Sequence, residues 1–309
     1  MSSLSLSMPS IAIKQSPVAF GVFLAIFSNV LFAVLYGYGK WLTVLSGTQI
    51  FLWRMVMMWL CLTVFLMVSG RLAQVKQELS TIKGVDSWLY FVAPTPILAS
   101  QLWLFMWAPV HGQSVQVAMG YFLFPLAMVL AGCWLFGEKL SALQKMAVLL
   151  AAMGVSSEIW RTGSVSWATL WVCGTYPIYY VMRRKVAVSA LAGLFFDVSI
   201  IAPVCLAYLS MTDIGTVGTS GILLAKVFGL GVISVLAILS NVEASRLLPV
   251  SLFGMLGYLE PVLLFGLSVT LLGGVFDVQM FTSYGLIWLA VVCLIVQGIW
   301  HKKSVDNTL

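Results

Sequence analysis

The sequence predicts an all-α integral membrane protein with ten transmembrane helices, arranged as a 5+5 inverted repeat around a central cavity. Three observations lead to this fold class. First, 61% of the 309 residues are hydrophobic and only 8% are charged, whereas a soluble domain carries about 25% charged residues. Second, ten apolar segments are long enough to cross a bilayer. Third, one pattern of glycine, tyrosine and proline occurs in two of these segments.

The ten segments follow from the lengths of the apolar runs, because a membrane span needs about 20 apolar residues. The connections between them are short, and the longest polar one runs from Gly70 to Asp86. The first apolar run is too long for the core of a signal peptide, so it is expected to stay as a transmembrane helix. The predicted spans are 18–36, 47–69, 87–107, 114–136, 142–160, 165–183, 190–210, 221–240, 248–272 and 280–300.

The placement of the cations predicts the orientation. If the N-terminus is cytoplasmic, 12 Lys and Arg residues fall on the cytoplasmic side and 3 on the other side, with Arg54 left inside a span. Cytoplasmic loops of membrane proteins carry such an excess of Lys and Arg. We therefore expect cytoplasmic tails at 1–17 and 301–309 and a multi-pass protein of the bacterial inner (cytoplasmic) membrane.

The fourth and ninth spans contain the repeated pattern. Each has a glycine and a tyrosine before a proline, and a second glycine 12 residues after that proline. A chance similarity between two apolar helices is the alternative explanation. The matching positions are Gly120-Tyr121 with Gly257-Tyr258, Pro125 with Pro261, and Gly137 with Gly273.

Two halves of five helices follow from this repeat, one covering 18–161 and the other 162–300. Because five is odd, the second half must enter the membrane from the opposite side. Inverted repeats of this kind recur in transporters, where the substrate site lies between the halves.

Five stretches carry a resemblance to a known family. They read WAPVHGQSVQVAMGYFLFPL, FGEKLSALQKMAVLLAAMGV, LWRMVMMW, YYVMRRKVAVSALAGLFFD and RLLPVSLFGMLGYLEP. Their order and spacing resemble the EamA-type drug/metabolite transporter superfamily, and most closely its RarD branch, over essentially the whole chain. The resemblance implies a permease with a central cavity of alternating access. The chain departs from the RarD pattern at Glu260-Pro261, where that pattern has Gly-Pro, so no relative's substrate is carried over.

Three ionisable residues lie well inside predicted spans, where a charge costs about 2.5–3.5 kcal/mol on insertion scales. Arg54 and Asp197 occupy related depths in equivalent helices, which predicts a charge pair or a clamp for a substrate carboxylate at the cavity. A purely structural ion pair is the alternative. Glu260 lies nearest the centre of its helix and is predicted to bind a proton or a substrate amine, unless burial simply holds it neutral.

Aromatic and proline residues complete the predicted site. Gln101 with Trp103, and Tyr121 with Tyr258, are expected to line the substrate pocket, although most such aromatic residues serve as membrane-interface anchors. Prolines inside spans free a backbone carbonyl and make either hinges or static kinks. The predicted hinges are Pro125, Pro203 and Pro261.

Several classes of protein are excluded by what the sequence lacks. It contains no phosphate-binding loop and no His/Asp/Glu cluster with metal-ligand spacing, so we expect no catalytic residue, no metal and no cofactor. The expected partners are the lipid bilayer and a small-molecule substrate, with protons as a candidate coupling ion and no nucleic acid. The small residues of 147–154 fit either close helix packing or a homodimer. Glu138 is expected to have a structural role, as a cap or paired with a nearby lysine.

The leading hypothesis is therefore a secondary active transporter, specifically an exporter, of small amphipathic metabolites or drugs. The alternative is a membrane-embedded enzyme that acts on a lipid-soluble substrate. A channel would need a continuous polar stripe, which no predicted helix shows.

Overall fold

The structure is a computed structural model that describes most of the chain between residues 17 and 296. The described residues are 17–42, 44–108, 111, 113–163, 166–186, 188–212, 217, 220–263, 285–286, 288–290, 292–293 and 296. Within these ranges the chain is helical and contains no strand. The prediction of an all-α protein is thus confirmed.

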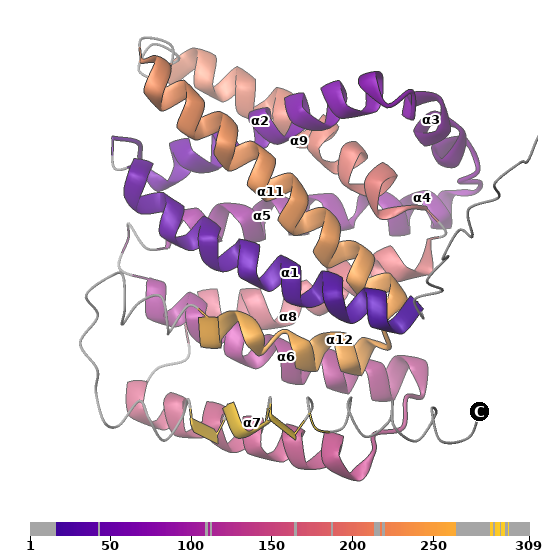
Figure 1. Cartoon of the computed structure of the whole chain (residues 1–309), viewed down its shortest axis with the longest axis vertical. Coiled ribbons are helices and arrows are strands. Elements are labelled where there is room, and N and C mark those ends of the chain that lie inside the picture. The colour runs from indigo at the N-terminus through magenta and orange to yellow at the C-terminus, as the bar shows by residue number, and fades with distance from the viewer. Residues whose placement is uncertain are drawn as a thin grey trace, which may run out of the picture.

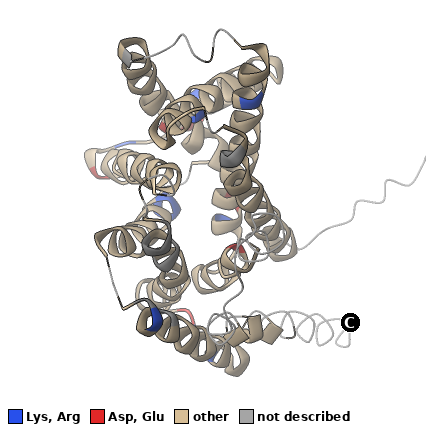
Figure 2. Cartoon of the chain, turned by 90° about the vertical axis from the view of Figure 1, so that its left-hand side faces the viewer, with Lys and Arg blue, Asp and Glu red and all other residues tan. Residues whose placement is uncertain are grey.

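The helices pack side by side in a bundle (Figure 1). Charged residues are sparse along it, and most of the ribbon carries neither sign of charge when the bundle is viewed towards the helix ends (Figure 2). The elements are α1 (Pro17–Tyr38), η1 (Gly39–Leu42), α2 (Gly47–Val68), α3 (Leu72–Ser80), α4 (Val85–Val92), α5 (Pro94–Trp107), α6 (Ser114–Phe136), α7 (Ala142–Thr162), α8 (Trp167–Lys185), α9 (Ala190–Thr212), α11 (Gly221–Leu247) and α12 (Val250–Leu256).

Six helical segments of the described chain are long and apolar enough to cross a membrane. Their bounds agree with six predicted spans to within a few residues, except that α11 continues seven residues beyond the predicted end of its span. Shorter apolar helices cover Gly120–Phe136 and Val250–Leu263. Most of the predicted tenth span, 280–300, lies outside the described residues, so the arrangement in two halves of five stays a prediction. The six segments are Pro17–Tyr38, Gly47–Val68, Val85–Trp107, Ala142–Arg161, Ala190–Met211 and Gly221–Leu247.

The polar connection between the second and third predicted spans contains a helix of its own, α3. Its buried residue Val75 packs with Leu66 of α2 and Phe91 of α4 in a satellite cluster. The remaining α3 residues are largely exposed. α3 is thus a short amphipathic helix that lies against one end of the bundle.

Helices from the two predicted halves pack against one another. α2 packs on α9 and α6 on α12, while α1 packs on α11 and α5 on α8. Glycines permit the closest approaches: a Cβ atom added at Gly231 of α11 would lie 2.5 Å from the Cβ of Met57 in α2, and one at Gly254 of α12 would collide with Met128 of α6. No larger residue fits at these crossings without displacing a helix.

The two proline helices differ in continuity. α6 passes through Pro125 without interruption, whereas α12 ends at Leu256, and the chain turns at residues 257–258 before helix resumes at 259–263. Pro261 lies four residues after Gly257, and a proline removes a hydrogen bond to the carbonyl four residues earlier. The break therefore falls where the proline predicts it. Pro203 also lies within an unbroken helix, α9.

Candidate functional site

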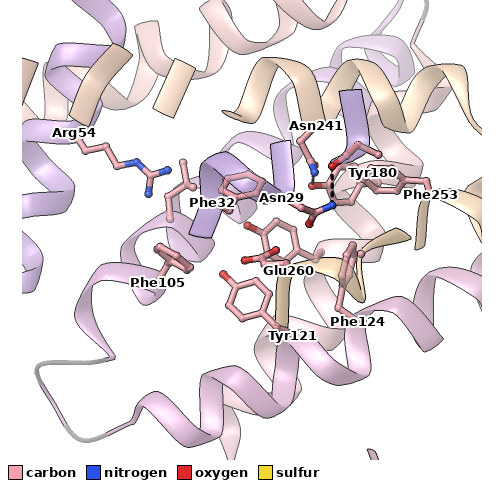
Figure 3. Close-up of a pocket in the computed structure, with 14 residues that line it drawn as sticks. Asn29, Phe32, Arg54, Phe105, Tyr121, Phe124, Tyr180, Asn241, Phe253 and Glu260 are labelled. Carbon is pink, nitrogen blue, oxygen red and sulfur yellow. Dashed lines mark hydrogen bonds between the residues drawn. The ribbon is translucent and has the colours of Figure 1, made fainter. Parts of the chain in front are cut away.

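A small cavity of about 40 Å³ lies in the middle of the bundle, between α1, α2, α5, α6, α8, α11 and the region around α12 (Figure 3). Both predicted halves contribute to its walls. At roughly 10–15 Å³ for each water, the cavity has room for about three water molecules. Its lining residues are Ala25, Asn29, Phe32, Arg54, Leu102, Phe105, Tyr121, Phe124, Tyr176, Tyr180, Asn241, Phe253, Gly257 and Glu260.

Arg54 supplies the positive charge of the cavity. It lies in α2 with no exposed surface, and its Nε donates a hydrogen bond of 2.7 Å to Ser234 Oγ of α11. Its two terminal nitrogens, Nη1 and Nη2, have no hydrogen-bond partner among the described residues. An uncompensated buried charge is costly, and a free guanidinium fork matches the geometry of a carboxylate. The two terminal nitrogens of Arg54 thus keep their capacity to donate hydrogen bonds into the cavity.

Glu260 supplies the negative charge. It follows the helix break at 257–258, and Figure 3 shows its carboxyl group in the cavity beside the ring of Tyr121. Within the described part of the chain, neither a hydrogen bond nor an ion pair is formed by this carboxyl group. Arg54 and Glu260 thus face one cavity, and both retain unused capacity to bind a proton or a polar group.

A polar network closes the other end of the cavity from Arg54 (Figure 3). Tyr180 donates its hydroxyl hydrogen to Asn241 Oδ1, and Asn241 Nδ2 donates to Ser28 Oγ at 3.2 Å. Asn29 Nδ2 donates to the carbonyl of Ala25 at 2.7 Å. Neither asparagine was among the residues predicted from the sequence. An amide inside an apolar span is itself a signal, since lipid offers it no partner.

Aromatic rings form the remaining wall. Phe105 meets Tyr121 edge to face with 6.0 Å between ring centroids, and Tyr180 packs on Phe253 at 4.9 Å. Tyr176 stacks on Tyr180 at 5.8 Å. Such rings suit an apolar or planar group held between the two charges.

The chain is similar along nearly its full length to known proteins. An "Uncharacterized transporter" of Haemophilus influenzae is 39% identical over 94% of this chain and 99% of its own length. The "Chloramphenicol-sensitive protein RarD" of Pseudomonas aeruginosa is 36% identical over 88% of this chain and 92% of its own length.

The chain belongs to the RarD family of transporters. No family model matches it. One solved crystal structure has a TM-score of 0.68 at 17% identity, covering 90% of this chain and 96% of that chain, and so shares its fold. The suspected membership of the drug/metabolite transporter superfamily and of its RarD branch is confirmed.

Four predicted binding residues of this RarD-family protein do not line the cavity, namely Gln101, Trp103, Tyr258 and Asp197. Gln101 Nε2 donates to Thr175 Oγ1 at 2.6 Å, and Trp103 Nε1 donates to Thr48 Oγ1 at 3.3 Å. Tyr258 lies in the helix break after α12 and is buried in a cluster with residues of α6 and α7. Of the seven predicted binding residues, the cavity brings together Arg54, Tyr121 and Glu260.

The predicted pairing of Arg54 with Asp197 is wrong. Asp197 lies fully buried in α9 and forms an ion pair with Arg183 of α8, and Thr95 Oγ1 donates to the same carboxylate oxygen at 2.6 Å. Arg183 was predicted to end the span 165–183 on the cytoplasmic side, at the start of a cationic run. Its guanidinium instead turns inward over the ring of Phe91, so this geometry favours a structural role for Asp197.

We predict that Asp197→Ala destabilises the RarD-family fold by about 3–5 kcal/mol, because it leaves the buried Arg183 unpaired. The double variant Arg183→Met, Asp197→Leu should recover most of this loss, since it removes both charges. Unfolding in mixed micelles measures both changes. A wild-type unfolding free energy for Asp197→Ala would contradict the structural assignment.

Proposed function

We propose that the protein is a secondary transporter of small amphipathic molecules that carry an anionic group, and that it works by alternating access. The observation that carries this proposal is Arg54, a fully buried guanidinium that faces the cavity and whose two terminal nitrogens have no partner among the described residues. The two oxygens of a substrate carboxylate would each accept a hydrogen bond from one of these terminal nitrogens. The aromatic wall would hold the apolar part of the same molecule.

Alternating access is supported by the size of the cavity and the origin of its walls. A drug-sized ligand needs about 300–1,000 Å³, far more than the cavity offers in this conformation. Helices of both predicted halves would have to separate to admit it. The packing of α2 on α9 and of α6 on α12 supports an inverted repeat, because these are the helices that would meet their own counterparts across a two-fold axis.

Proton coupling is assigned to Glu260. Its carboxyl group shares the cavity with Arg54 and makes no hydrogen bond within the described chain. When ionised, it repels the substrate anion and attracts the guanidinium; when protonated, it does neither. Proton binding would therefore favour substrate binding in the same cavity, which is the differential interaction that coupling requires.

We propose the orientation of the protein in the membrane from the cations near one end of the bundle. α3, the α11–α12 junction and the first turn of α1 lie at one end, on the right of Figure 1. Lys76 of α3 and the cations Arg184 and Lys185 in the last turn of α8 lie in parts of the chain that we assign to the cytoplasmic side. Export from that side is the direction expected from the sequence. Because the proton and the substrate would bind together, an outward gradient of the substrate would drive this export and carry protons out with it.

The test is a substrate screen with purified protein in proteoliposomes, with and without a pH gradient. The library should pair each carboxylate with its primary amide, which has nearly the same shape and no charge. We expect gradient-driven transport of some carboxylates and little transport of their amides. Equal transport of both members of every pair would refute the role of Arg54, and transport unaffected by the gradient would refute proton coupling.

A further inference from the structure

The junction between α11 and α12 is held by a carboxylate from the other predicted half. Glu138 lies in the connection between α6 and α7, and its Oε1 accepts a hydrogen bond of 2.6 Å from the backbone N–H of Val250. Its Oε2 accepts bonds from the N–H and the hydroxyl group of Ser251, at 2.7 and 2.6 Å. Glu138 was expected to act as a cap or to pair with a nearby lysine. It does bind the start of a helix, but that helix lies more than 110 positions away, across the two halves.

A cation holds the other side of the same junction. Arg184, at the end of α8, donates from Nη1 to the carbonyl oxygen of Leu248 at 2.8 Å, and its guanidinium lies over the ring of Phe136. An anion therefore meets the first N–H groups of α12, and a cation meets the carbonyl of Leu248, the residue that caps the end of α11, as the dipoles of the two helices favour.

A second carboxylate joins the halves nearby. Glu78 of α3 accepts a hydrogen bond of 2.9 Å from the backbone N–H of Ser189, just before α9. Partial burial would raise the pKa of Glu78, but hydrogen bonds from Ser189 and Gln74 outweigh burial and lower the pKa below its usual value. Glu78 thus stays ionised near neutral pH. Glu138 and Glu78, from two connections of the first predicted half, thus bind the starts of α12 and α9 in the second half.

The contacts of Glu138 and Arg184 at the α11–α12 junction differ from the Arg183–Asp197 ion pair in their access to water. Glu138 and Arg184 are half-buried at the end of the bundle, so water can replace their hydrogen bonds when the junction separates. Arg183 and Asp197 are buried and would leave bare charges inside the protein if they parted. The first kind of contact can open and close, whereas the second is expected to persist.

We propose that Glu138 is a gating residue, whose bonds to Val250 and Ser251 hold the transporter closed on the side that we assign to the cytoplasm. This inference rests on the proposed function. The cavity is too small for a substrate of drug size, so some contact between the halves must break before one enters. The Glu138 contact joins the halves, lies at the end of two cavity-lining helices and can be hydrated. It holds the start of α12 from outside the cavity lining.

The test measures access to a thiol beneath the junction. Ser245 is buried in the last turn of α11, and Ser245→Cys changes a single atom. Among the native cysteines, Cys205 of α9 is buried and serves as an internal control, with the other four replaced by alanine. Inside-out and right-side-out vesicles are treated with a membrane-impermeant maleimide, and labelling of each thiol is followed by mass spectrometry.

We expect Glu138→Gln to raise the labelling rate at position 245 about tenfold from the cytoplasmic face, as the loss of one charge-assisted hydrogen bond implies. Labelling of Cys205 should not change. Lys139→Gln, which removes the neighbouring charge, should leave both rates at their starting values.

Two results would overturn the proposal. An unchanged rate at position 245 would show that Glu138 does not hold this side closed. Equal increases at position 245 and at Cys205 would show a loss of folding rather than an opened gate. Since no substrate enters the assay, a failure of the proposed transport activity would not produce either result.

Discussion

A Glu260→Gln protein is expected to lose proton-driven transport while it still exchanges bound substrate. Glutamine has nearly the shape of protonated glutamate and cannot release a proton, so the variant stays in the neutral form. Only one of the two states needed for coupling would remain. Substrate would still reach Arg54, because the neutral side chain does not repel an anion.

The decisive measurement is substrate-driven proton flux in proteoliposomes at matched protein levels. We expect the flux of Glu260→Gln to fall at least about 100-fold, while exchange of labelled for unlabelled substrate stays within a few-fold of wild type. Glu243→Gln is the matched control, because Glu243 pairs with Arg246 near the end of α11, outside the cavity lining. Wild-type proton flux in Glu260→Gln would eliminate the coupling role.

Replacement of Arg54 is expected to have the second largest effect. Arg54→Met removes both free guanidinium nitrogens, so binding of carboxylate substrates should weaken about 100-fold, as the loss of a bidentate charged contact to a buried site implies. Binding of the matching amides should change little. Isothermal titration with each carboxylate and amide pair separates the two effects. Arg54→Lys keeps the charge without the fork and should give an intermediate affinity.

The stability of the empty protein provides an independent check on Arg54. A buried charge without a partner costs free energy, and its replacement by an apolar residue of similar volume is often stabilising by about 1–4 kcal/mol. We therefore expect Arg54→Met to unfold at a higher temperature than wild type while it binds anions poorly. A lower unfolding temperature would instead indicate that Arg54 serves mainly to hold α2 against Ser234 of α11.

Much of the helix layout could be predicted from the sequence. Lipid admits only long apolar helices, so the lengths of the apolar runs alone placed α2 at Gly47–Val68 and α7 at Ala142–Thr162 within two residues. The cost of a charge inside a span likewise singled out Arg54 and Glu260, and both line the cavity. The helix break near Gly257 follows from the proline four residues later.

The partners of these residues could not be predicted in the same way. Apolar residues cover all faces of a membrane helix, so periodicity does not reveal which face meets which neighbour. Arg183 was therefore expected only to mark the cytoplasmic end of its span, and Asp197 was paired with Arg54 of the equivalent helix. The asparagines of the cavity were not predicted, whereas Gln101 was, because a buried amide needs a partner but the sequence does not tell which amides face the cavity.

The helix break at residues 257–258 has a consequence for the timing of the transport cycle. It separates Val250 and Ser251, which Glu138 holds, from Glu260, which faces the cavity. An unbroken helix would oblige both ends to move at once, as one rod. With a break between them, the release of Glu138 and the arrival of a proton can follow one another as separate kinetic steps. Pre-steady-state measurements should then resolve two phases. Glu138→Gln should change the rate of one phase, and Glu260→Gln should change the rate of the other.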